Sequence, residues 1–200
     1  MADAGRAVGH LMRVVMATRN EHKLREVREI VPGIEIVALD EALGEPPETG
    51  DSFEANALEK ARYVFARTGL PTIADDSGLE VSALGWAPGV RSKRWTPEAT
   101  DRANNERLVA SLRGIENRRA RYRCAMALVT SRGERTAEGT CWGTIALAPR
   151  GAGGFGYDPY FLPDAYPGRT MAEVTAEEKH RVSHRGQAFR ALPELLDELG

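Results

Sequence analysis

Two adjacent carboxylates, Asp75 and Asp76, follow a short apolar segment and precede a serine and a glycine in residues 72–78 (TIADDSG). Two like charges at the expected end of a strand repel each other and lose hydration when buried, so a positive group is expected beside them. Asp oxygens are natural Mg²⁺ ligands, which makes a divalent metal the main candidate. The alternative is a solvated turn, and this segment alone does not decide between the two.

A second polar cluster, residues 18–23 (TRNEHK), lies where a strand is expected to run into a helix. Backbone N–H groups at a helix N-terminus attract phosphate, and Lys23 adds a positive charge in the first turn. The run lacks the glycine spacing of a Walker A loop. An ordinary capped helix with exposed charges is the alternative.

Two charged residues are associated with the next expected helix. Glu48 lies in the loop before it, and Lys60 lies two turns inside it. The strand after this helix returns to the same end of the sheet, so Glu48 could complete a carboxylate set with Asp75 and Asp76. A solvent-facing acid and a solvated lysine are the alternatives.

Residues 151–159 (GAGGFGYDP) combine glycines with two aromatic side chains. Glycine lets the backbone approach a ligand closely, and Phe155 and Tyr157 offer faces on which a base can stack. Further along, Arg185 in residues 183–186 (SHRG) is a rigid donor fork suited to a keto oxygen or a phosphate. A flexible loop and a surface His-Arg pair are the alternatives.

The elements that position these residues predict an α/β fold with a mixed sheet. The helix signals include an N-cap at Asn20 and capping boxes that begin at Asp51 and Thr175. Strands are expected at residues 12–18, 34–39, 72–76, 119–130 and 135–147, and helices at 21–31, 51–67, 97–112 and 187–199. A two-residue hairpin turn at Arg132-Gly133 predicts that Cys124 and Cys141 pair directly across the hairpin as free thiols.

Composition limits the class of protein. The 200 residues fit one domain, expected at 12–200 after a flexible extension at 1–11 that does not resemble a signal peptide. The net charge of -2 gives no long-range attraction for nucleic acid or an anionic membrane, and no apolar run approaches the roughly 18 residues that span a bilayer. Two cysteines imply no disulfide framework, so a reducing cytoplasm is expected.

Taken in order, the motifs resemble those of the inosine triphosphate pyrophosphatase family over about residues 12–199. They are Thr18-Arg19-Asn20-x-x-Lys23, Glu48-Thr49-Gly50, Ala74-Asp75-Asp76-Ser77-Gly78, Gly154-Phe155-Gly156-Tyr157-Asp158-Pro159 and Ser183-His184-Arg185-Gly186. The resemblance implies an elongated α/β fold with two lobes around a central nucleotide-binding cleft. It also implies a homodimer that uses Mg²⁺ to hydrolyse ITP, dITP and XTP to the monophosphate and pyrophosphate.

The resemblance also assigns roles by position. Glu48, Asp75 and Asp76 are implied metal ligands, and Asp76 is the implied general base. Substrate contacts are implied for Thr18, Arg19, Asn20, Glu21, His22, Lys23, Lys60, Ser77, Phe155, Gly156, Tyr157, Asp158, Lys179, His184 and Arg185. The family usually has glycine where this chain has Arg19, whose side chain could add a phosphate contact.

Three rival functions are weighed against this one. A Maf-type nucleotide pyrophosphatase shares the architecture but acts on other bases, and the motifs around Phe155 and His184 argue against it. A nucleotide-binding sensor would not need the full set of Glu48, Asp75 and Asp76. A nucleic-acid-binding module is disfavoured by the net charge of -2 and the lack of a basic stripe.

Overall fold

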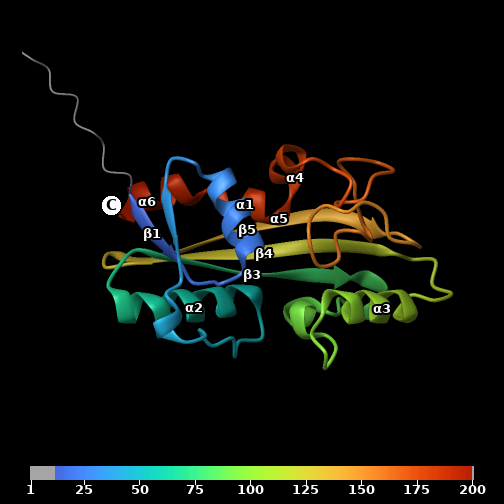
Figure 1. Cartoon of the computed structure of the whole chain (residues 1–200), viewed down its shortest axis with the longest axis horizontal. Helices are drawn as coiled ribbons and strands as arrows, with labels where there is room; N and C mark the ends of the chain where they lie inside the picture. The colour runs from blue at the N-terminus through green and yellow to red at the C-terminus, as the bar shows by residue number, and fades with distance from the viewer. Residues whose placement is uncertain (1–11, 200) are drawn as a thin grey trace, which may run out of the picture.

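The computed structural model describes residues 12–199, which form an elongated mixed sheet flanked by helices (Figure 1). The strand order is β2-β1-β3-β4-β5-β6, with β2, β1 and β3 parallel and the others antiparallel. The strands are β1 Arg13–Met16, β2 Glu35–Ala38, β3 Thr72–Val81, β4 Arg119–Thr130, β5 Gly133–Ile145 and β6 Phe161–Pro163. The predicted α/β fold with a mixed sheet is confirmed, whereas the predicted extension at 1–11 lies outside the described residues.

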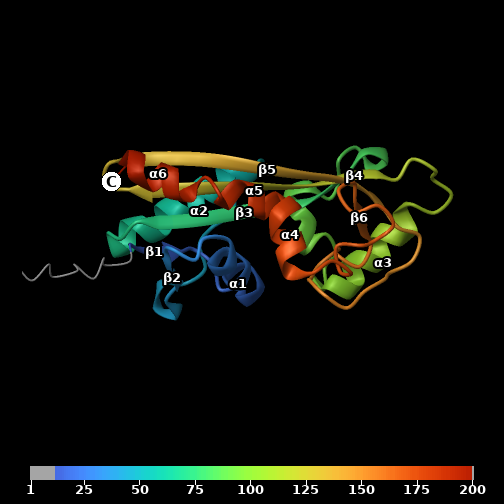
Figure 2. The same ribbon diagram turned by 90° about the horizontal axis from the view of Figure 1, so that it is seen from above.

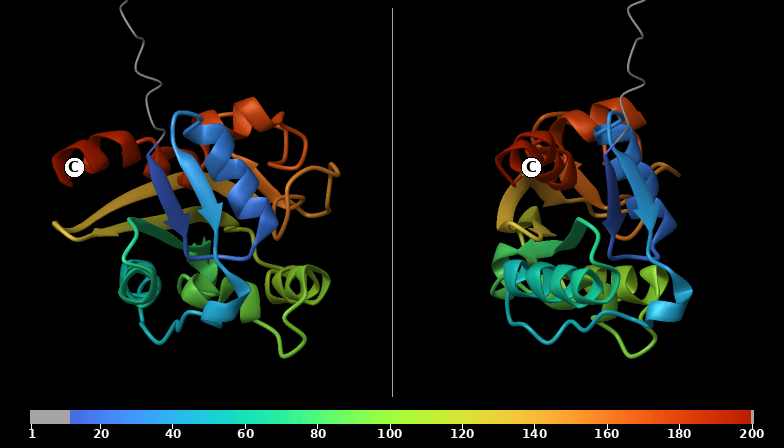
Figure 3. Two further views of the ribbon diagram at one scale, coloured as in Figure 1. Left: turned by 60° about the vertical axis from the view of Figure 1, so that its left-hand side comes forward. Right: turned by 90° about the vertical axis from the view of Figure 1, so that its left-hand side faces the viewer.

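Helices cover both sides of the sheet. The α-helices are α1 Glu21–Ile30, α2 Phe53–Thr68, α3 Asp101–Ser111, α4 Ala176–Val182, α5 His184–Phe189 and α6 Leu192–Leu199, and the 3-10 helices are η1 Glu41–Leu43, η2 Ser82–Leu84 and η3 Gly89–Arg94. In Figure 1, α2 and α3 lie below the sheet, and α1, α4, α5 and α6 lie above it. The view along the long axis separates α2 from α6 in the same way (Figure 3). None of the helices in residues 12–199 has the length and apolar character needed to cross a bilayer.

The core is divided into three hydrophobic clusters. Two lie on opposite faces of the β1 end of the sheet. One, around Met16 and Phe189, is packed between the sheet and α1, α5 and α6. The other, around Ala61 and Ala74, is packed between the sheet and α2. The third lies at the far end and joins β3, α3 and β4 to the segment after β5, around Leu79 and Phe161. This division gives the molecule two lobes, and α1 and α4 lie side by side where the lobes meet (Figure 2).

Strand β3 does not end at Asp75-Asp76 as predicted but continues to Val81. All ten of its residues pair with β4, from Thr72 opposite Val129 to Val81 opposite Ala120. Gly78 lets η3 pack closely on the continued strand, because a Cβ there would lie 2.3 Å from Ser92 Oγ of η3. The two carboxylates therefore lie within a strand rather than in a turn.

Two helices begin later than predicted. Helix α2 is capped by Ser52 and not by Asp51, because the Ser52 hydroxyl accepts a hydrogen bond from the Ala55 backbone N–H at 3.1 Å. Helix α3 is capped by Thr100 and not started by Pro97. Ala99, between Pro97 and Thr100, has a φ of +49°, which interrupts any helix that starts at Pro97.

The C-terminal helix is two helices rather than the predicted single one at 187–199. Pro193 lacks the N–H that would bond to the carbonyl of Phe189, so α5 ends at Phe189 and α6 starts separately at Leu192. The first of the two helices begins at His184, where the Ser183 hydroxyl accepts a hydrogen bond from the Gly186 backbone N–H at 3.0 Å.

The hairpin register differs from the prediction by two residues. Thr130 pairs with Gly133, so the turn is Ser131-Arg132, and Cys141 lies opposite Tyr122 instead of Cys124. Gly139 occupies the place opposite Cys124, and a Cβ there would lie 2.0 Å from the carbonyl oxygen of His184. Both cysteines are nevertheless free and buried, as predicted.

Candidate active site

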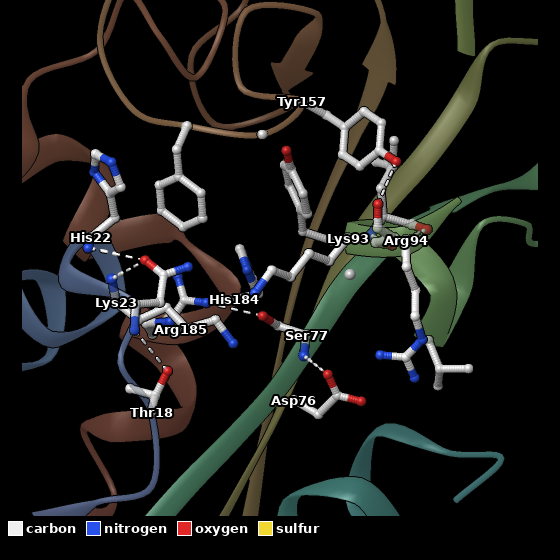
Figure 4. Close-up of a pocket in the computed structure, with 18 of the residues that line it drawn as sticks. Thr18, His22, Lys23, Asp76, Ser77, Lys93, Arg94, Tyr157, His184 and Arg185 are labelled. Carbon is white, nitrogen blue, oxygen red and sulfur yellow. Dashed lines mark hydrogen bonds between the residues drawn. The ribbon is translucent and has the colours of Figure 1, made fainter. Parts of the chain in front are cut away.

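A cavity of about 650 Å³ lies between the start of α1, the middle of β3, η3 and the helices α4 and α5 (Figure 4). Most of the predicted functional residues line it: Thr18, Asn20, His22, Lys23, Glu48, Lys60, Asp76, Ser77, Phe155, Gly156, Tyr157, Asp158, Lys179, His184 and Arg185. Arg19, Glu21 and Asp75 are not among its walls. Segments distant in the sequence therefore meet at one site.

The loop from β1 to α1 is held in shape by its own side chains. The side-chain oxygen of Asn20 accepts hydrogen bonds from the backbone N–H groups of His22 and Lys23, at 3.0 and 3.3 Å. The Thr18 hydroxyl accepts one from Asn20 N at 3.2 Å. The predicted N-cap is confirmed, and it fixes Lys23 in the first turn at the edge of the cavity.

Arg19 and Glu21 lie outside the cavity walls, so the structure does not place them where their predicted substrate contacts require. The Arg19 guanidinium donates to the carboxylate of Glu45 at 2.9 Å and to the carbonyl of Gly44 at 2.8 Å. Glu21 is exposed in the first turn of α1, where a negative charge complements the helix dipole.

Asp75 and Asp76 point to opposite faces of the sheet because side chains alternate along a strand. The Asp75 carboxylate is fully buried and binds Lys23 Nζ and Arg185 Nη2, both at 3.0 Å. Asp76 lines the cavity and accepts a hydrogen bond from the Asn56 side-chain amide at 2.8 Å. Asp75 therefore does not join Asp76 in the carboxylate set expected from the sequence.

Glu48 is the carboxylate that accompanies Asp76. Lys60 Nζ donates to Glu48 at 2.6 Å and to the backbone carbonyl of Asp75 at 2.7 Å, which ties the loop before α2 to β3. Arg94 of η3 holds the second oxygen of Glu48 at 2.6 Å. Burial raises the pKa of Glu48, but Lys60 and Arg94 outweigh it and lower this pKa to about 2.

The electrostatics of Asp76 differ from those of Glu48. Burial raises the pKa of Asp76 above its ordinary value, and the opposing effects of Lys60 and the Asn56 hydrogen bond do not cancel it. A carboxylate with a raised pKa in a cavity is suited to accept a proton or to face a cation.

Glu48 and Asp76 are suited to hold a divalent cation together. Within residues 12–199, no three His, Cys, Asp or Glu side chains converge into a complete metal cage. Mg²⁺ needs no such cage, because it commonly takes one or two protein carboxylates and completes its shell with phosphate oxygens and water. The donor set therefore fits Mg²⁺ that binds together with a phosphorylated ligand.

The face of β3 that carries Asp75 holds a buried ion network. Arg185 is 1% exposed and donates to Asp75 and to Glu26 of α1, the latter at 2.6 Å. Lys179 of α4 bridges Glu26 and Asp158, both at 2.7 Å. Burial raises the pKa of Glu26, but the two cations outweigh it and lower this pKa to about 2. The Arg185 side chain thus reaches the cavity wall as a fixed part of this network.

The segment after β5 contributes Phe155 to the cavity wall. Oδ2 of Asp158 accepts a hydrogen bond from the Phe155 backbone N–H at 3.0 Å, which folds the loop back on itself. Gly154 has a φ of +71°, and a Cβ there would lie 2.1 Å from Asp158 Oδ2, so this position requires glycine. The Phe155 ring stacks on His22 with 5.2 Å between centroids.

Several cavity residues were not singled out from the sequence, including Lys93 and Arg94 of η3 and Tyr122 of β4. In Figure 4, Lys93 and Arg94 lie across the cavity from His22 and Lys23. The only signal for them was three basic residues in the run 91–94 (RSKR). Lys93 is the one lysine or arginine lining the cavity for which residues 12–199 provide no carboxylate partner; the paired ones are Lys23, Lys60, Arg94, Lys179 and Arg185.

The chain is similar to proteins of one known family over nearly its whole length. A model of the Ham1 family matches residues 14–195. The chain is 50% identical to the dITP/XTP pyrophosphatases of Frankia alni, over 94% of this chain and 98% of that protein, and of Thermus thermophilus, over 92% and 91%. A solved HAM1 protein from Coxiella burnetii superimposes with a TM-score of 0.82 at 38% identity, covering 94% of this chain and all of that one.

Proposed function

Because the chain belongs to the Ham1 family, we propose that it hydrolyses non-standard purine nucleoside triphosphates (ITP, dITP and XTP) to the monophosphate and pyrophosphate. The observation that carries this proposal is one cavity that combines a carboxylate pair, Glu48 and Asp76, with several cations and an aromatic loop at Phe155. These are the groups that a metal-bound triphosphate and a purine base require.

We propose Mg²⁺ as the cofactor, held by Glu48 and Asp76; when bound, it supplies Lewis-acid polarisation of the phosphate. Asp76 is the proposed general base for the attacking water. The Asn56 amide and the Ser77 backbone N–H each hold one of its oxygens, at 2.8 and 2.9 Å, which fixes the plane of the carboxylate. Each oxygen keeps a further lone pair for a proton.

The cations offset the charge of the phosphates. Lys60 and Arg94 pair with Glu48 in the described structure, and both line the cavity. A Glu48 that held Mg²⁺ would exchange these pairings for the metal, and N–H groups of Lys60 and Arg94 would then serve phosphate oxygens. Lys93 needs no such exchange. Positive groups placed in advance beside the leaving pyrophosphate stabilise the charge that develops there.

Selection of the base follows from donors near Phe155. Lys179 Nζ lies 4.9 Å and Arg185 Cζ 5.8 Å from the centroid of its ring, and both side chains carry only hydrogen-bond donors. Hypoxanthine and xanthine present a 6-keto acceptor to such donors, whereas adenine presents a 6-amino donor. A buried donor left unpaired is costly, so ATP should be a poor substrate.

The test is pyrophosphate release from ITP, XTP, dITP, GTP and ATP, with Mg²⁺, with EDTA and with Ca²⁺. We expect rapid release from the first three with Mg²⁺, none with EDTA, and little with Ca²⁺ because its coordination is larger and looser. Full activity in EDTA would overturn the metal role. Preference for ATP, or for pyrimidine nucleotides, would overturn the substrate assignment.

We further propose a cytoplasmic homodimer. Two free buried cysteines suit a reducing compartment, and the exposed Trp86 and Trp142, at 40% and 39%, offer apolar surface to a second copy. Light scattering should give twice the mass of 21.9 kDa. A monomer at micromolar concentration would contradict the dimer.

A further inference from the structure

We propose that Tyr122 is a positioning residue for base recognition, which orients Asp158 through its hydroxyl and His184 through its ring. The hydroxyl donates to Asp158 Oδ1 at 3.2 Å, and the ring lies parallel to the His184 imidazole, 4.7 Å between centroids and 12° between planes. This inference rests on the proposed function, because its main readout is hydrolysis.

The backbone of Tyr122 is rigidly held. It pairs with Leu79 of β3 on one side and with Cys141 of β5 on the other, in the middle of three long strands. Its side chain is 6% exposed, lines the cavity and packs against Phe161 with 4.6 Å between centroids. A side chain fixed on a central strand can orient groups that come from a loop and from a short helix.

The hydroxyl completes the hydrogen bonding of Asp158. Oδ2 of this carboxylate accepts from Lys179 and from the Phe155 backbone, whereas Oδ1 has Tyr122 as its only protein donor in residues 12–199. Burial and the Asp158 charge raise the pKa of Tyr122 well above 10, so the hydroxyl keeps its proton and donates. Loss of this donor leaves Oδ1 unsatisfied and lets the carboxylate rotate, which loosens the backbone of Phe155.

The Tyr122 ring orients the His184 imidazole, which hydrogen bonds within residues 12–199 do not hold in place. Burial, and then Arg185, lower the pKa of His184 well below 6.5, so the imidazole is neutral. Its Nδ1 is buried without a hydrogen-bond partner in the described part of the chain. The plane of the ring is therefore set by its stacking on Tyr122. One side chain thus orients two cavity walls that are 26 residues apart in the sequence, at Asp158 and His184.

The two contacts can be separated by substitution. Tyr122→Phe keeps the stacking and removes the hydroxyl, whereas Tyr122→Leu removes both. Tyr63→Phe is the matched control, because it removes a tyrosine hydroxyl that donates to the Leu43 carbonyl at 2.9 Å, and Tyr63 does not line the cavity. For each variant, KM and kcat are measured with ITP and ATP, and the Kd of IMP is measured by calorimetry.

For Tyr122→Phe we expect KM for ITP and Kd for IMP to rise about 10- to 100-fold, the scale of a lost hydrogen bond to a charged group, with kcat within twofold. Tyr122→Leu should raise both further, and Tyr63→Phe should change neither. An unchanged KM and Kd in Tyr122→Phe would overturn the proposal, as would an equal loss for ITP and ATP accompanied by a lower Tm. If the wild type hydrolysed no triphosphate, the proposed function would fail, while the IMP measurements would still decide the role of Tyr122.

Discussion

Asp75 and Asp76 are neighbours of the same chemical type, yet they lie in opposite environments on the two faces of β3. Asp75 is fully buried, and although burial raises its pKa, Lys23, Arg185 and Lys60 outweigh this and hold the pKa far below its ordinary value. Asp76 faces the cavity, has no salt bridge within residues 12–199, and has a raised pKa. The network around Asp75 stabilises the fold, whereas the groups around Asp76 are available to a ligand.

The charged groups on the Asp75 face are paired and buried, whereas those on the Asp76 face include exposed groups that a ligand can reach. On the Asp75 face, Glu26, Lys179 and Arg185 are each less than a tenth exposed and form fixed ion pairs. On the Asp76 face, Glu48 and Arg94 are partly exposed, and Lys93 has no carboxylate partner in the described chain. Substitutions of Asp75 and Glu26 should act mainly on stability, whereas those of Asp76 and Lys93 should act on turnover or binding.

The largest effect is expected from Asp76→Asn. The amide keeps the shape of the side chain but cannot accept a proton, so kcat should fall about 10²- to 10⁴-fold. The Tm should fall less than in Asp75→Asn: the new amide NH2 faces the Asn56 or the Ser77 donor, but removing a buried charge with a raised pKa offsets part of that loss. Pyrophosphate release and thermal unfolding check the two halves of this prediction. Near-normal kcat in the folded variant would remove Asp76 from the reaction.

Asp75→Asn should lose much more stability than Asp76→Asn. Removing one charge from a buried ion pair leaves Lys23 and Arg185 poorly compensated and should cost about 3–5 kcal/mol of unfolding free energy. Urea unfolding of Asp75→Asn beside Asp76→Asn is the matched measurement. Equal stabilities of the two variants would show that the two faces do not differ in the way described.

Glu26→Gln should make the stability of the buried ion network depend less on pH. The pKa of Glu26 is about 2 in the folded protein, below its ordinary value of 4.5, so its contribution is fully present above pH 4.5 and is lost as the pH falls toward 2. The variant should be about 3 kcal/mol less stable at pH 7, and the gap should narrow below pH 4.5. Urea unfolding between pH 7 and 3 measures this difference in stability between variant and wild type. Glu194→Gln, at an exposed residue, is the control. A gap that does not change with pH would mean that ion pairing is not its source.

Lys93→Ala should give the smallest effect. Lys93 is exposed and has no carboxylate partner in residues 12–199, so its removal should leave the Tm unchanged and raise KM for the triphosphate about 2- to 5-fold, the scale of one exposed charge contact. The rise should shrink at high salt. A lower Tm with unchanged KM would place Lys93 among the structural charges.

The sequence was sufficient for the fold class and for most cavity residues because these depend on local patterns and on motifs of known spacing. The separation of Asp75 from Asp76 was not foreseen, since it depends on β3 continuing past them, which only its pairing with β4 brings about. Glu26 was missed because its partner Arg185 lies 159 residues away. The hairpin register was wrong because Gly139, placed by the approach of α5, selects the pairing from outside the hairpin.

The long sequence span of the buried ion pairs also bears on how the chain is made. Glu26 is synthesised early, but the cations that pair with it, Lys179 and Arg185, come more than 150 residues later. A nascent chain therefore cannot bury the Glu26 carboxylate at low cost until α4 and α5 have left the ribosome. Truncation before Lys179 should leave a product that does not reach the native state, although both α1 and β3 are complete within it.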